Sequence, residues 1–132
     1  MNYLAILVSA FVGMAVGFFW YGPLFGKVWV KLSGFTKEQM AEAQAKGMGK
    51  TYALTVLALL ITCYILSLFI VEFSLTTSEA LRFAFLGWLA FIVPTMANMV
   101  LWDGKPGKLY FLNIAERLVS LLLITLVLSS WK

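Results

Sequence analysis

The sequence has no histidine, a single cysteine and few charged residues. The lack of histidine excludes zinc and haem sites that use imidazole ligands, and the lone Cys63 excludes a framework of disulfides. Charged residues make up 12% and hydrophobic residues 62% of the 132 residues, whereas soluble domains have about 25% charged residues. So few charges cannot cover the surface of a small soluble domain, and a disordered chain needs low hydrophobicity. These absences leave an integral membrane protein.

The sequence contains long runs of apolar residues. A helix that crosses the roughly 30 Å hydrocarbon core needs about 20 mostly apolar residues. Four runs approach or exceed this length: 3–20, 51–71, 80–101 and 109–131. They lack the short alternating strands of a β-barrel, and the first run lacks the basic start and cleavage site of a signal peptide. The sequence therefore predicts an all-α membrane protein, with one integral domain over 1–132 and four transmembrane helices.

The lysines and arginines predict how these helices are oriented. The connections after the first and third runs carry seven basic residues and the opposite side carries two: Lys27, Lys31, Lys37, Lys46, Lys50, Lys105 and Lys108 against Arg82 and Lys132. Because basic loops stay in the cytoplasm, we expect both connections there and both termini outside a cell (inner) membrane. The net charge of +4 then favours contact with anionic lipid headgroups. Nucleic-acid binding is disfavoured, since the lysines are scattered and form no binding motif.

The connection 21–50, called the elbow below, is expected to contain helices of its own. After Pro23, apolar residues fall on one face and two lysines on the other, which is typical of a short amphipathic helix in the headgroup plane. Ser33–Gly34 ends this helix, and Thr36 with Gln39 has the spacing of a capping box for a second, polar helix. The elbow is either a plain membrane-surface anchor or a docking surface for a soluble partner.

A motif at the start of the elbow resembles that of a known family. It consists of aromatic residues around a proline and a glycine: Trp20, Tyr21, Pro23, Phe25, Gly26 and Trp29. This string resembles the signature of an uncharacterised membrane family, domain of unknown function 1761. The opening residues 1–5 and the later 104–106 with Asn113 are also similar, so the resemblance covers essentially the whole chain. It implies a compact four-span protein with no established activity, and it offers no catalytic residues.

Small residues recur at four-residue spacing along the first run, at Ala5, Ser9, Gly13 and Gly17. Such a stripe lets two helix backbones approach closely in lipid. It lies either at a seam within the four-helix bundle or at a contact between subunits. The bundle is favoured, because three other helices are available as partners. We also expect a homo-oligomer, since a small membrane protein buries little surface alone.

The fourth run contains charges that the bilayer makes costly. Asn113, Glu116 and Arg117 share one face with Ser120, and Glu116 lies about 12 Å along the helix from Lys108. Neighbouring residues on a helix point about 100° apart, so we expect Glu116 and Arg117 to seek partners elsewhere rather than each other. The candidate partners, which together would line a polar pocket open to the cytoplasm, are Asn98, Tyr21 and Tyr52. Pro94 is expected to kink the third helix, which either shapes this pocket or improves packing.

Three function classes remain after these exclusions. The first is a structural or accessory membrane protein that acts through helix packing and the elbow. The second is a binder or transporter of a small amphiphile or lipid headgroup, in the pocket around Glu116 and Arg117. The third, a membrane enzyme, is disfavoured because no general acid–base constellation is visible. We expect no catalytic residue, no metal and no cofactor.

Overall fold

The computed structural model describes residues 2–34, 38–39, 41–42 and 49–131, and helices are the only regular elements in these ranges. Four helical segments are long and apolar enough to cross a membrane: Tyr3–Leu24, Gly49–Glu72, Thr77–Leu101 and Gly107–Ser130. This confirms the expected all-α membrane fold with four spans. The capping box at Thr36 and the polar helix expected after it involve residues that lie outside the described ones.

The spans are built from α-helices and two π-helical turns. The first consists of α1 (Tyr3–Phe19) and η1 (Trp20–Leu24), and is followed by α2 (Gly26–Ser33) in the elbow. The second is α4 (Gly49–Glu72) and the fourth is α8 (Gly107–Ser130). The third is divided into four parts, α5 (Thr77–Gly87), η2 (Trp88–Ile92), α6 (Val93–Met96) and α7 (Asn98–Leu101).

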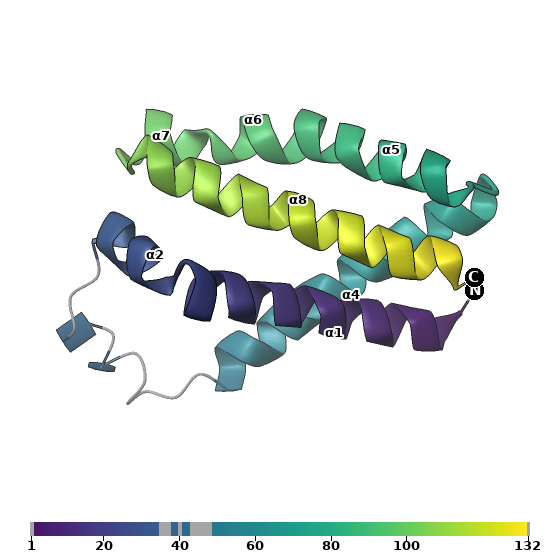
Figure 1. The fold of residues 1–132 in the computed structure, drawn as a ribbon, viewed down its shortest axis with the longest axis horizontal. Helices are drawn as coiled ribbons and strands as arrows, with labels where there is room; N and C mark the ends of the chain where they lie inside the picture. Colours follow the sequence, from purple (N-terminus) through teal and green to yellow (C-terminus); the bar gives the residue numbers. More distant parts are fainter. Residues whose placement is uncertain (1, 35–37, 40, 43–48, 132) are drawn as a thin grey trace.

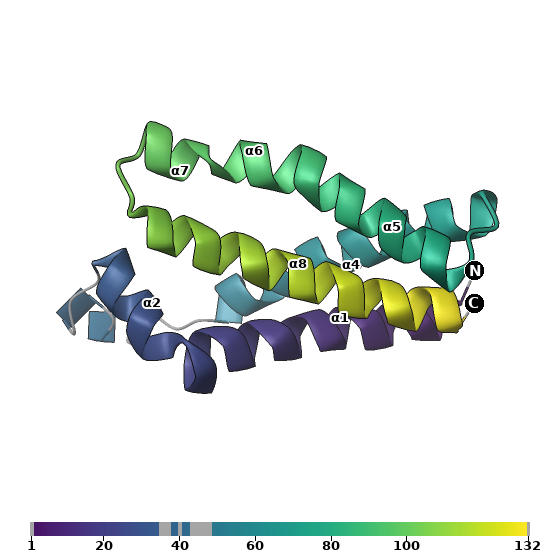
Figure 2. The same ribbon diagram turned by 45° about the horizontal axis from the view of Figure 1, so that its top comes forward.

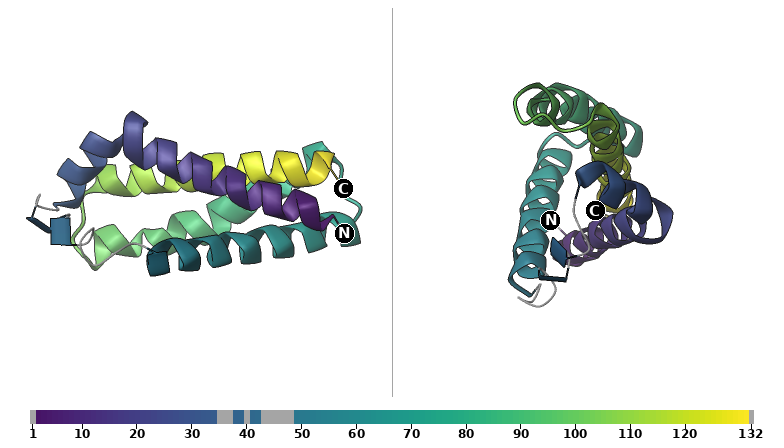
Figure 3. Two further views of the ribbon diagram at one scale, coloured as in Figure 1. Left: turned by 90° about the horizontal axis from the view of Figure 1, so that it is seen from below. Right: turned by 90° about the vertical axis from the view of Figure 1, so that its left-hand side faces the viewer.

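The helix α8 has the most extensive contacts with the other spans. It packs against α1, against α5 and, less extensively, against α4. Seen along the bundle, the spans follow one another around it in the order α4, α5–α7, α8 and α1 (Figure 3). The helix α4 crosses α1 obliquely and diverges from the other spans toward its own start (Figure 1), where residues 49–58 are exposed.

The two ends of the chain meet at one end of the bundle (Figure 2). The side-chain nitrogen of Asn2 donates a hydrogen bond to the carbonyl of Trp131 over 3.3 Å. The elbow helix α2 and the connection between α7 and α8 lie at the opposite end. The described parts of the two basic connections therefore share one end, here called the lysine end, and the termini share the other.

The core lies toward the terminal end, between α1, α4, α8 and the start of α5. It contains these buried apolar residues: Ala5, Ile6, Ala10, Cys63, Leu66, Ile70, Ala80, Ile124 and Leu128. Ser9 and Gly13 of the small-residue stripe are also buried. A Cβ atom added at Gly13 would lie 2.8 Å from a methyl group of Leu59 and 3.3 Å from one of Ile124. The structure thus places this part of the stripe inside the single chain.

The first span extends further than expected. We predicted that it ends at Trp20 and that Pro23 opens a new helix, but Pro23 lies inside η1 and α2 begins only at Gly26. The amide of Phe25 donates to the carbonyl of Trp20 over 2.9 Å, which closes a wide π-type turn. A proline ring collides with the carbonyl four residues earlier in a regular α-helix, and a wider turn relieves this collision. The end of α2 agrees with the prediction, since Gly34 adopts a left-handed φ of 75°.

The third span is irregular around Pro94, as the sequence predicted. The π-helical turn η2 ends at Ile92, two residues before the proline, and Ala97 separates α6 from α7. The hydroxyl of Tyr110 donates to the carbonyl of Val93 over 2.6 Å. A side chain from the fourth span therefore occupies a backbone acceptor beside the break, which is how membrane helices tolerate such irregularities.

Candidate functional site

A short stretch of α8 collects polar contacts from the first and third spans. The indole of Trp20 donates to the carbonyl of Leu112 over 3.2 Å, and that of Trp88 to the carbonyl of Ile114 over 2.8 Å. Between these two carbonyls, the side chain of Asn113 accepts a hydrogen bond from the hydroxyl of Tyr21 over 2.8 Å.

The two tryptophans hold equivalent positions in the two π-helical turns. Trp20 is the first residue of η1 and Trp88 is the first residue of η2. An indole N–H without an acceptor is costly in hydrocarbon, so each bond ties its irregular turn to α8. Neither contact was predicted from the sequence. The motif singled out Trp20 without giving it a role, and no signal in the sequence marked Trp88 as a donor to α8.

A polar cavity of about 180 Å³ opens beside this stretch at the lysine end. Five side chains line it: Tyr21, Trp29, Met96, Asn113 and Arg117. Trp29 reaches it from α2, and its ring centroid lies 5.7 Å from that of Tyr21. The elbow helix thus forms one wall of the cavity.

The charges on α8 pair with each other, which corrects our expectation. The Nε atom of Arg117 lies 3.7 Å from a carboxylate oxygen of Glu116. The arginine side chain is long enough to bend back along the helix, so the angle of 100° between neighbouring residues does not keep the charges apart. The two environments differ, because the side chain of Glu116 is 4% exposed and that of Arg117 is 55% exposed.

Glu116 is turned toward α1 rather than into the cavity. Its Oε1 atom would lie 4.0 Å from a Cβ atom added at Gly17. The missing side chain at Gly17 leaves room for the carboxylate between the two helices. Glu116 therefore pairs with Arg117 from the side that faces α1, while Arg117 lines the cavity.

The structure does not bring two of the predicted site residues to this cavity. Asn98 is exposed on α7, and its backbone carbonyl accepts the amides of Trp102 and Asp103. Tyr52 is 57% exposed on the divergent first half of α4. Of the six predicted ligand-binding residues, Tyr21, Asn113 and Arg117 line the cavity and Glu116 adjoins it. Trp29 and Met96 are additional walls, and only Trp29 was marked in the sequence, as part of the family motif.

The arrangement is suited to recognition of an anionic group. Glu116 is the only residue in the described part of the chain that forms an ion pair or hydrogen bond with the Arg117 side chain. That pair uses Nε, so the terminal guanidinium nitrogens keep donors for a phosphate or carboxylate. Among the described residues, no three histidine, cysteine or acidic side chains come together as a metal site.

Comparison with known proteins gives one match. A family model described as "Protein of unknown function (DUF1761)" matches residues 4–129. Neither the curated proteins nor the solved structures contain a match to this chain.

Proposed function

The chain belongs to the DUF1761 family of proteins of unknown function. We propose that it is a small integral membrane protein that binds the anionic headgroup of a membrane amphiphile at Arg117. One observation carries the proposal. Arg117 is half-exposed in a polar cavity, while the buried carboxylate of Glu116 holds its guanidinium from the other side. An arginine inside a membrane span is costly to insert, and such residues mark functional sites by default.

The dimensions of the cavity favour a headgroup over a larger molecule. The volume of about 180 Å³ is well below the roughly 300–1,000 Å³ of sites for drug-sized ligands. The aromatic ring of Trp29 and the thioether of Met96 offer apolar contact beside the charged donor. A phosphate or carboxylate with a short apolar continuation fits this combination.

The orientation of the protein determines which leaflet supplies the ligand. The described parts of the basic connections lie together at the end where the cavity opens, and the termini lie at the other. With basic loops in the cytoplasm, the cavity faces the cytoplasmic leaflet and both termini lie outside. Anionic lipids are concentrated in that leaflet.

A structural or accessory role is the second candidate, and the contact between Tyr21 and Asn113 favours it. This hydrogen bond of 2.8 Å satisfies two polar groups of the cavity within the protein. Polar side chains that bridge helices in this way commonly serve as clamps without a ligand. The two candidates differ in what happens when an anionic amphiphile is added.

The test is lipid-dependent thermal stabilisation of the purified protein in a neutral detergent. We expect phosphatidylglycerol to raise the unfolding temperature more than phosphatidylcholine does, because a ligand at 100 times its Kd stabilises the native state by about 2.7 kcal/mol. The double variant Glu116→Gln with Arg117→Met removes both charges and leaves no buried carboxylate unpaired. We expect phosphatidylglycerol to raise the unfolding temperature of this variant less than that of the wild type.

The matched control is Arg82→Met, the same change at an exposed arginine near the terminal end. It should keep the full preference for phosphatidylglycerol. If the double variant, once shown to be folded by circular dichroism, keeps the full preference as well, the cavity is not the binding site and the accessory role remains.

A further inference from the structure

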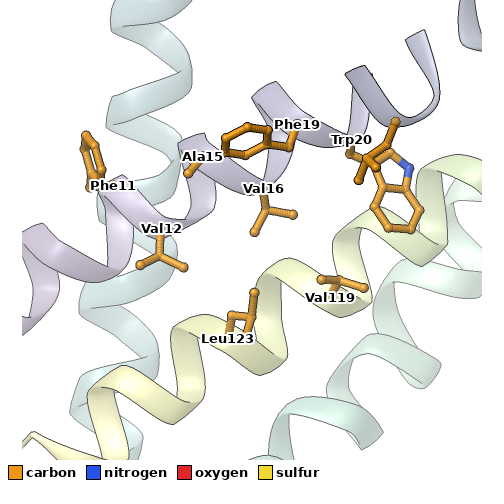
Figure 4. A pocket seen from close by; sticks show the side chains of 9 residues that line it. Phe11, Val12, Ala15, Val16, Phe19, Trp20, Val119 and Leu123 are labelled. Atoms are coloured by element: carbon orange, nitrogen blue, oxygen red, sulfur yellow. The ribbon is translucent and has the colours of Figure 1, made fainter. Parts of the chain in front are cut away.

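A second hollow lies between the first and fourth spans and is wholly apolar. It has a volume of about 410 Å³ and is called the α1–α8 groove here. Its lining residues come from α1, η1 and α8: Phe11, Val12, Ala15, Val16, Phe19, Trp20, Leu24, Val119 and Leu123. Figure 4 shows Val12 and Val16 pointing from α1 toward α8, with Val119 and Leu123 pointing back.

The groove is a slot that opens to the surroundings of the protein. Phe11, Ala15 and Phe19 are spaced four residues apart and so share one face of α1. The two phenylalanines are 75% and 54% exposed, whereas Ala15 contributes only a methyl group between them. The groove is therefore bordered by two phenylalanine rings with the small Ala15 between them, and it opens outward.

The depth of the groove matches one leaflet of the bilayer. It lies entirely within the span Tyr3–Leu24. From Phe11 to Leu24 the helix advances about 20 Å at 1.5 Å per residue, compared with roughly 15 Å for half of the hydrocarbon core. The groove thus extends from the middle of the membrane to the lysine end, and the surrounding medium over this length is lipid chain.

Positive charge lies just beyond the lysine end of the groove. Trp20 and Leu24 line this end of the groove, and the ring of Phe25 packs on that of Trp20 with 4.7 Å between the ring centroids. Lys27 follows two residues later in the first turn of α2, and Lys31 lies one turn further on; both are exposed. The headgroup of a lipid whose chain filled the groove would therefore meet positive charge at this end.

The groove is separate from the cavity at Arg117. Val119 comes two residues after Arg117, which is about 200° around α8. The two hollows therefore lie on opposite sides of this helix. From the shape, depth and charge of the groove, we propose that it binds one acyl chain of an anionic phospholipid of the lysine-end leaflet, with the phosphate at Lys27.

Native mass spectrometry of the protein released from detergent micelles tests this assignment. All chains in this experiment carry Glu116→Gln with Arg117→Met, which removes the anionic site at Arg117. Without further changes, this chain, reconstituted with phosphatidylglycerol and phosphatidylcholine in equal amounts, should retain one phospholipid, preferentially phosphatidylglycerol. Ala15→Phe fills the slot and should lower the retained fraction at least tenfold. Ala53→Phe makes the same change at an exposed alanine of α4 and should leave retention unchanged. Lys27→Gln should keep the lipid but abolish the preference for phosphatidylglycerol.

This background separates the groove from the cavity at Arg117, because it removes the charges of the cavity and should still retain the groove lipid. Ala15→Leu, a smaller filling, provides the same test if the phenylalanine variant does not fold. Retention by both Ala15 variants at the level of Ala53→Phe would overturn the assignment. A mass of two chains, reduced to one by Ala15→Leu, would also overturn it in favour of a second copy as the occupant.

Discussion

At the scale of single residues, Gly26 lies tightly against the backbone of the preceding turn. A Cβ atom at this position would lie 2.9 Å from the carbonyl oxygen of Tyr21. The obstacle is backbone, which cannot rotate away as a side chain does. The glycine of the family motif thus allows α2 to fold back directly after η1, and this fold brings Trp29 over the cavity.

We expect Gly26→Ala to destabilise the protein by about 1–3 kcal/mol, the usual cost of forcing an extra methyl group into a closed space. The free energy of unfolding, measured by titration of sodium dodecyl sulfate into mixed micelles, gives the value. The control is Gly22→Ala four residues earlier, where the added methyl group meets nothing within 4 Å. Equal stability of the two variants would show that the contact with Tyr21 does not constrain the turn.

At the scale of elements, α1 is held by its small residues on one side and by Trp20 at its end. Gly13 lets α1 approach both Leu59 of α4 and Ile124 of α8. Gly17 leaves the space that Glu116 occupies. The stripe predicted from the sequence therefore serves two purposes that the sequence did not separate, close packing at Gly13 and room for a carboxylate at Gly17.

Gly13→Leu tests the seam. We expect a loss of about 1–3 kcal/mol in the free energy of unfolding, because the larger side chain separates α1 from both neighbours. Gly87→Leu is the control, since an added side chain there begins in open space. The same detergent titration measures both variants. A Gly13→Leu protein as stable as Gly87→Leu would mean that the helices repack without cost.

At the scale of the whole molecule, the four spans form an uneven bundle. The helix α8 contacts each of the other three spans, whereas the first half of α4 is exposed on all sides and the third span has few buried residues. Exposed apolar faces are ordinary for a helix in lipid. The homo-oligomer expected from the sequence stays a prediction.

The shared location of the termini makes the orientation testable with cysteine labels. In a Cys63→Ala background, we expect Trp131→Cys to react with a membrane-impermeant maleimide applied to right-side-out vesicles. Lys105→Cys, at the lysine end, should react only after the vesicles are opened. The physical reason is the excess of lysines at that end, which favours the cytoplasmic side. Labelling of Lys105→Cys in closed vesicles would reverse the orientation and place the cavity in the outer leaflet.

The sequence was sufficient for the four spans, the end of α2 at Gly34 and the irregularity at Pro94. Each depends on a local property: a long apolar run must close its backbone hydrogen bonds as a helix in lipid, and glycine and proline act on their own turns. The candidate site was predicted in part. Polar residues at helical spacing identified Asn113 and Arg117, which line the cavity, but the expected face shared with Glu116 is not found, since Glu116 turns toward α1.

The contacts between spans depended on the assembled fold. A helix that is apolar all round has no preferred face in lipid, so its rotation and tilt are decided by packing against its neighbours. The divergence of α4 keeps Tyr52 away from the cavity, and Asn98 is exposed beyond the break in the third span. Packing likewise brought Trp88 to the carbonyl of Ile114. The low content of charged residues that indicates a membrane protein is also the reason why the sequence does not determine how each helix is rotated about its own axis.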